Sequence, residues 1–180
     1  DTFLFVFDKN RNDADSFIKA TCSEILFNLQ EPIFYNYTGE QEVIRFLWMR
    51  PFDNPVVIRV NKFRDTVYAN IKELSKGIPN AEQFTYTADI DTILMLDTKK
   101  WKDILLSFES ENFWNTIAAD TLLDYKDATS WILECRLKNK YRCIKRTSLD
   151  SSAFKNVGYF NELYDLGNRV TSMRNSREDR

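Results

Sequence analysis

Residues 42–74 read EVIRFLWMRPFDNPVVIRVNKFRDTVYANIKEL, and this stretch carries the clearest fold signal in the chain. Apolar side chains recur in it at every second position, which is the period of a β-strand with a buried face. Two turn signals divide it, the proline-bounded segment 51–55 and the pair Arg64-Asp65. Strands that follow one another through short turns pair antiparallel. We therefore predict three antiparallel strands, which begin at Glu42, Val56 and Thr66.

Three more segments predict strands. A weaker alternating pattern runs from Thr87 to Leu96. Farther along, Trp131 to Leu137 and Tyr141 to Thr147 flank the pair Lys138-Asn139, an arrangement that is typical of a hairpin. These segments extend the antiparallel pattern beyond residue 74.

Helical spacing of apolar residues occurs in three places. The first helix starts near residues 15–16, where an aspartate or a serine can cap it, and stops before Pro32. The second follows an aspartate or threonine cap at residues 97–98, and the third spans residues 153–170. The apolar stripes of the first two helices consist of Ile18, Cys22, Ile25, Leu26 and Leu29, and of Trp101, Ile104, Leu105 and Phe108.

These elements predict a single α+β domain over residues 1–170. We expect an antiparallel sheet of about five to six strands with two to three helices packed on one face. Residues 171–180 hold five charges and are predicted to form a flexible charged tail. The apolar segment 3–7 predicts a short strand or an anchor and is too short to span a bilayer.

The composition excludes several classes of enzyme. The 180 residues carry a formal net charge of −2 and contain no histidine, so triads that use an imidazole and histidine-ligated metals are excluded. Four scattered glycines match neither of the phosphate-binding loop patterns. We accordingly expect no cofactor, and the small negative charge predicts no general attraction to nucleic acid or to an anionic membrane.

The three cysteines do not form a disulfide framework. Cys22 lies on the apolar stripe of the first helix and is predicted to be a core residue. Cys135 and Cys143 lie on either side of the predicted hairpin turn, so a disulfide between them stays open as the less favoured alternative. Arg136 follows Cys135 directly, but adjacent strand residues point to opposite faces, which favours a core thiol over a catalytic one.

Aspartates offer a second candidate chemistry. Asp89 and Asp91 share a face of the strand predicted at 87–96, where a carboxylate pair serves acid–base catalysis or binds a hard cation. Asp120, Asp124 and Asp127 form an acidic loop without the spacing of a calcium-binding loop. In both places, solvated carboxylates are the simpler interpretation.

The predicted hairpin 131–147 carries the densest cluster of charge. Cations that alternate with aromatic residues on a two-stranded ribbon suit an acidic protein partner or a nucleic-acid backbone. They also suit a solvated edge that lysines protect from strand pairing. The candidate partner-binding residues are Arg136, Lys138, Lys140, Tyr141, Arg142 and Arg146.

Glu134 is a polar residue in an otherwise apolar strand. A carboxylate in such a position needs a cation nearby, because an unpaired buried charge is costly. The candidate partners are Arg45, Arg59 and Arg146. We predict a structural ion pair here in preference to a catalytic acid.

Two motifs carry a resemblance. They are R-x-x-x-x-R-x-F-x-N-P at residues 45–55 and W-I-L-E at residues 131–134, followed by a hairpin with a tyrosine. Over residues 42–165 their order resembles a family of small bacterial proteins with no agreed activity. That family favours glycine where this chain has Cys135 and Lys140, and histidine where it has Arg142. The resemblance implies a bacterial origin and possible export, and any role of that histidine is absent from this chain.

The absence of a catalytic constellation favours a non-enzymatic module that binds another protein, and an acidic protein is the candidate that the hairpin charge suits. An inhibitor or a bacterial immunity protein is a concrete example, by analogy. The alternatives are an aspartate-based metal-dependent enzyme or metal-binding protein, and nucleic-acid binding through the hairpin, which is the least favoured. The sequence leaves the location open between the bacterial cytoplasm and export, if a signal peptide was removed before Asp1.

Overall fold

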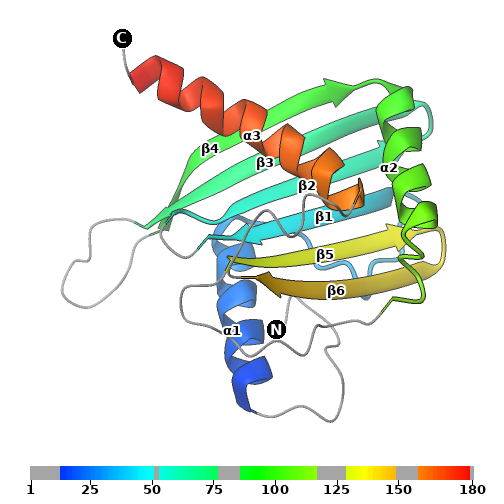
Figure 1. The fold of residues 1–180 in the computed structure, drawn as a ribbon, viewed down its shortest axis with the longest axis horizontal. Helices are drawn as coiled ribbons and strands as arrows, with labels where there is room; N and C mark the ends of the chain where they lie inside the picture. Colours follow the sequence, from blue (N-terminus) through cyan, green and yellow to red (C-terminus); the bar gives the residue numbers. More distant parts are fainter. Residues whose placement is uncertain (1–12, 51–52, 77–85, 117–128, 149–157, 179–180) are drawn as a thin grey trace.

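The computed structural model describes residues 13–50, 53–76, 86–116, 129–148 and 158–178 (Figure 1). The predicted segment 3–7 lies outside these residues. The elements follow one another as α1 (Asp13–Asn28), β1 (Glu42–Met49), β2 (Val56–Phe63), β3 (Thr66–Lys76), β4 (Tyr86–Leu96), α2 (Thr98–Ser110), β5 (Thr129–Leu137), β6 (Lys140–Ser148) and α3 (Gly158–Glu178).

The six strands form one antiparallel sheet in the order β4-β3-β2-β1-β5-β6. This confirms the predicted α+β fold. The hairpins turn at the predicted pairs, because Phe63 lies opposite Thr66 and Leu137 lies opposite Lys140. The hairpin β5–β6 joins the sheet through β1, with Arg45 directly opposite Glu134.

Both faces of the sheet are apolar. Side chains of β1, β2 and β5 pack in two clusters, one under α2 and α3 and the other under α1. Figure 1 shows α2 and α3 on one side of the sheet and α1 on the other. Two helices therefore share one face, as predicted, but α1 covers the opposite face. Successive residues of a strand point to opposite faces, so Leu47 and its neighbours on β2 and β5 point away from α2 and α3. Cys22, Leu26 and Leu29 of α1 pack on these side chains. The run Val43–Trp48, buried at every position, is typical of a strand covered on both sides.

The helices α1 and α2 end in the same backbone motif. In α1, Gln30 has a φ of 54° and the N–H of Glu31 donates to the carbonyl of Leu26. In α2, Asn112 has a φ of 49° and the N–H of Phe113 donates to the carbonyl of Phe108. This is the Schellman arrangement, which satisfies carbonyls at the helix end and turns the next residue back toward the helix.

The helix boundaries agree with the prediction in part. Asp97 caps α2, and its carboxylate accepts a hydrogen bond of 2.8 Å from the N–H of Lys99. The third helix continues to Glu178, so most of the segment predicted as a tail at residues 171–180 is helical. Its predicted start at residue 153 lies outside the described residues. Among the described helices, none is both long and apolar enough to cross a membrane.

Candidate functional site

The candidate hairpin residues are divided between the two faces of the sheet. Lys140, Arg142 and Arg146 lie opposite Leu137, Cys135 and Trp131, which belong to the core under α2 and α3. Directly opposite residues of an antiparallel pair share a face. Arg136 and Tyr141 lie opposite each other on the α1 side, and Lys138 lies in the turn.

Arg142 and Arg146 hold a segment of the chain that follows α2. The guanidinium of Arg142 donates to the carbonyls of Trp114 and Thr116. Arg146 donates to the hydroxyl of Thr116 at 3.2 Å and to the carbonyl of Lys145 at 2.7 Å. These two arginines therefore have internal partners that position Trp114.

Arg136 and Tyr141 also have internal partners. Arg136 donates to the carbonyl of Phe34 at 3.4 Å, and its guanidinium lies 5.7 Å from the ring centroid of Tyr37. The hydroxyl of Tyr141 donates to the carboxylate of Glu134 at 2.7 Å. Arg136 thus attaches the segment after α1 to the sheet, and Tyr141 links β6 to β5 on the α1 side.

Lys138 and Lys140 are exposed and line a groove between α2 and the β5–β6 turn. The groove has a volume of about 550 Å³, which is within the range of sites that bind small ligands or single side chains. We call it the α2–hairpin groove. Its lining consists of Glu42, Leu105, Phe108, Glu109, Trp114, Leu137, Lys138, Asn139 and Lys140.

The groove combines an apolar lining with charged residues. Phe108 and the half-buried Trp114 and Leu137 supply the apolar part. The ammonium of Lys140 lies 5.8 Å from the ring centroid of Trp114, a cation–π distance. Neither lysine forms an ion pair with any described residue, whereas Glu42 is 3.4 Å from Lys62.

The backbone of Lys138 is strained. Its φ is 54°, in the left-handed region that costs a residue other than glycine roughly 1–2 kcal/mol. Arg64, in the turn between β2 and β3, has the same φ of 54°. Strain of this kind is concentrated at functional sites, although turns also contain it.

The exchange Lys138→Gly is expected to raise the free energy of unfolding by about 0.5 kcal/mol, because relief of the strain exceeds the entropic cost of glycine. Urea denaturation measures the change. Arg64→Gly is the matched variant and is expected to give a similar gain. A loss of stability in both variants would show that neither turn is strained.

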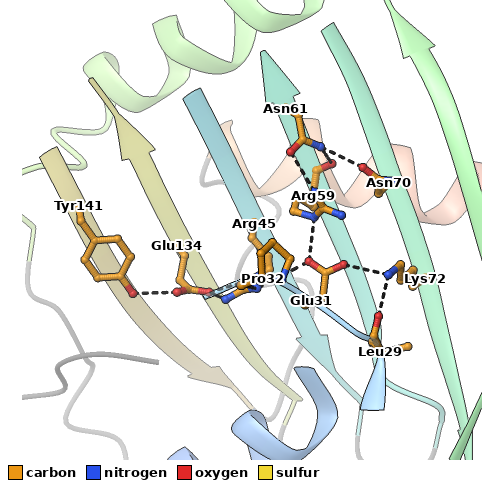
Figure 2. A network of polar contacts seen from close by, with 10 residues as sticks. All are labelled: Leu29, Glu31, Pro32, Arg45, Arg59, Asn61, Asn70, Lys72, Glu134 and Tyr141. Atoms are coloured by element: carbon orange, nitrogen blue, oxygen red, sulfur yellow. Dashed lines mark hydrogen bonds and ion pairs between the residues drawn. The ribbon is translucent and has the colours of Figure 1, made fainter. Parts of the chain in front are cut away.

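A buried network of charges crosses the α1 side of the sheet (Figure 2). Arg45 on β1 donates from Nε to the carboxylate of Glu134 on β5 at 2.7 Å, and a second bond runs from Nη2 to the same oxygen. Arg45 also donates to the carbonyl of Pro32 at 2.7 Å and stacks 4.3 Å from the ring centroid of Phe34. Of the three predicted partners of Glu134, the structure selects Arg45.

Glu31 is the second carboxylate of the network. It lies 2.9 Å from Nε of Arg59, 3.6 Å from Nη1 of Arg45 and 3.4 Å from Nζ of Lys72. Lys72 also donates to the carbonyl of Leu29 at the end of α1, at 2.6 Å. Figure 2 shows Glu31 between these cations. Sequence reasoning missed Glu31, whose only signal was its place just after the helix and before a proline.

The network is structural. The side chains of Glu31, Arg45 and Glu134 are 0–2 % exposed, which leaves no access for a substrate. Burial raises the pKa of Glu134 above its ordinary value, and the Arg45 charge beside it offsets part of that effect. Burial and the Glu134 charge raise the pKa of Tyr141 as well, so its hydroxyl keeps the proton that it donates.

The raised pKa of Glu134 predicts a pH dependence of stability. The folded state holds the proton of this carboxyl at a higher pH than the unfolded chain, whose ordinary value is 4.5. Its contribution to stability is therefore complete below pH 4.5 and is lost as the pH rises through the folded-state pKa. Urea denaturation between pH 4 and pH 8 measures the difference between the native chain and Glu134→Gln, which does not titrate at this position. The native chain should gain stability relative to the variant as the pH falls, and a constant difference would contradict this prediction.

The cysteines are free and buried. Cys135 lies opposite Arg142 and Cys143 lies opposite Glu134, so these two thiols point to different faces and the alternative of a disulfide between them is wrong. Burial raises the pKa of Cys22 to about 12 and raises the pKa of the other two thiols as well. Protonated, buried thiols are poor nucleophiles.

The aspartate candidates lie apart from the groove. Asp89 and Asp91 are exposed on the edge strand β4, and Asp91 lies opposite Lys72. The acidic loop at residues 120–127 lies outside the described residues. In the part of the chain that the structure describes, no three side chains of histidine, cysteine, aspartate or glutamate gather to hold a metal ion.

Comparisons with known proteins leave the question of family open. No model of a protein family matches the chain, and no curated protein matches it. The resemblance to small bacterial proteins therefore stays a prediction.

Proposed function

We propose that the protein is a non-enzymatic module that binds another protein through the α2–hairpin groove. An apolar side chain of the partner enters the groove beside Phe108 and Trp114. Carboxylates that flank this side chain in the partner meet Lys138 and Lys140. A module of this kind acts by occupying its partner's surface, as an inhibitor or a bacterial immunity protein does.

One observation carries this proposal: two exposed lysines, which form no ion pair with any residue that the structure describes, line a partly apolar groove of about 550 Å³. Sites of high binding energy at protein interfaces combine a buried anchor with a charged or polar rim. The φ of 54° at Lys138 supports the proposal as well, because backbone strain is concentrated at functional sites.

The same observations favour a protein over a nucleic acid. Arg142 and Arg146 donate to Trp114, Lys145 and Thr116, so their guanidinium groups are used within the chain. Binding to a nucleic-acid backbone requires a continuous row of cations along a groove. The α2–hairpin groove has two lysines on the hairpin side and Glu109 on the α2 side.

An array of synthetic peptides tests the proposal. Each peptide carries one Phe, Trp or Leu between aspartates and glutamates, and its matched peptide carries Asn and Gln in their place. The native protein is expected to bind acidic peptides and not their amide counterparts. The double variant K138E/K140E is expected to weaken binding at least about tenfold, because charge reversal replaces attraction with repulsion.

The control variant is K99E/K102E, which changes the same charge on the exposed surface of α2. It should bind the acidic peptides as the native protein does. If both double variants lose binding equally, net charge and not the groove explains the interaction. If the native protein binds no acidic peptide, the proposed recognition is wrong.

A further inference from the structure

The strand β4 is an edge of the sheet with an uncharged half. Among the residues that the structure describes, β4 (Tyr86–Leu96) pairs with β3 and with no other strand. Its last five residues, 92–96, read TILML and contain no charge and no proline. Natural edge strands avoid pairing with other chains through charges, prolines, bulges or a cover. The register shift between β3 and β4 lies at Glu73 and Leu74 of β3, opposite Ile90 and Ala88 of β4, away from these five residues.

Two apolar side chains of this half project into solvent. Ile93 and Met95 lie opposite Asn70 and Tyr68, on the α1 side of the sheet. They are 63 % and 71 % exposed, although Leu94 between them and Leu96 beside Met95 pack on the core under α2 and α3. Exposed apolar residues at alternate positions of an unpaired edge are a template for another strand.

The other edge of the sheet has the opposite character. β6 carries Lys140, Arg142, Lys145 and Arg146 within nine residues. Two copies that met through this edge would bring cations against cations. Within residues 92–96 of β4, by contrast, an identical copy meets no like charge.

We propose that two copies of the chain pair through β4, antiparallel and about a two-fold axis, to form one continuous sheet. A register centred on Leu94 sets Ile93 opposite Met95 of the partner subunit on the α1 side. On the other side it sets Leu94 opposite its symmetry-related copy. The paired window, residues 92–96, is then uncharged in both copies.

A second copy fits this edge better than a strand of another protein, because the window is complementary to itself. The two-fold axis makes the Ile93–Met95 contact twice, and it closes the assembly at two copies. The cationic β6 edges remain at the two outer ends and oppose further growth. The α2–hairpin groove includes residues of β5 and β6, so pairing through β4 leaves it open.

Sedimentation of the full chain over a range of concentrations tests this pairing. A short strand-to-strand contact predicts a weak dimer, with a Kd of about 10 μM. Ile93→Lys places a charge in the window and is expected to weaken dimerisation at least about tenfold. Because Ile93 is 63 % exposed, the variant should keep the native thermal transition.

The control is Leu106→Lys, which adds the same charge at a residue of α2 that is 60 % exposed. It should leave the dimer unchanged. Thiol cross-linking then tests the register, since the native cysteines are buried. A mixture of I93C and M95C chains should cross-link faster than either chain alone. A chain that stays monomeric at about 200 μM, or a dimer insensitive to Ile93→Lys, would overturn the proposal.

Discussion

Replacement of Arg45 by alanine is expected to lower the free energy of unfolding by about 3–5 kcal/mol, as is typical when one partner of a buried ion pair is removed. Arg45 is 1 % exposed and lies between the carboxylates of Glu134 and Glu31. Its removal leaves Glu134 with Tyr141 as its hydrogen-bond donor in the network of Figure 2. Chemical denaturation measures the loss.

Two further variants separate the cost of an unpaired charge from the value of the pair. In Arg45→Met combined with Glu134→Leu, both charges are replaced by apolar groups, and most of the lost stability should return. Lys62→Ala breaks a half-exposed pair with Glu42 and should cost less than about 1 kcal/mol. If Arg45→Ala costs no more than Lys62→Ala, the network does not stabilise the fold.

Replacement of Phe108 by alanine is expected to cost about 3–5 kcal/mol, the usual penalty for a fully buried aromatic ring. Phe108 is 1 % exposed and stacks on Phe113 with ring centroids 4.6 Å apart. Leu106→Ala, at a residue of the same helix that is 60 % exposed, should change stability by less than about 0.5 kcal/mol. Thermal and urea denaturation measure both variants, and equal losses would contradict this account of the core.

The Phe108 variant also reports on the groove, because this ring belongs both to the core and to the groove lining. Loss of the ring removes a surface on which the proposed apolar anchor rests. Binding of the acidic peptides should therefore weaken together with stability. Leu106→Ala, outside the groove lining, should leave binding unchanged.

Most of the sheet could be predicted because its signals are local. The bounds of β2 coincide with the predicted segment from Val56 to Phe63, and the hairpin turns occur at the predicted pairs. Alternation of apolar residues and short turns depends only on neighbours in sequence, so one chain is enough to recognise them. The helix cap at Asp97 could be predicted for the same reason, because a cap depends only on the residues next to it in sequence.

Contacts between distant segments were harder to predict. The choice of Arg45 for Glu134 over Arg59 and Arg146 depends on the register of β1 against β5, which no turn connects directly. The position of α1 depends on which face of the sheet its stripe meets, and both faces are apolar. Glu31 joins the network only because the Schellman end of α1 turns the chain back over the sheet.

Contacts between distant segments also decide which of the candidate hairpin residues remain available to a partner. The sequence grouped six hairpin residues, and strand alternation divides them between two faces. The contacts of Arg142 and Arg146 with residues 114–116 could not be predicted, because the intervening chain has no periodic pattern. Lys138 and Lys140 are the two of the six that the described structure leaves without a polar partner.

The reactivity of the three buried thiols can report which layer of the fold separates first during unfolding. Cys22 on α1 and Cys143 on β6 lie in the cluster between α1 and the sheet, whereas Cys135 lies in the core under α2 and α3. A thiol reagent in native buffer modifies only molecules in which the relevant layer has separated. If α1 detaches before the sheet melts, Cys22 and Cys143 will react at one rate and Cys135 at a slower one. A common rate for all three would mean that the two layers separate in a single cooperative event.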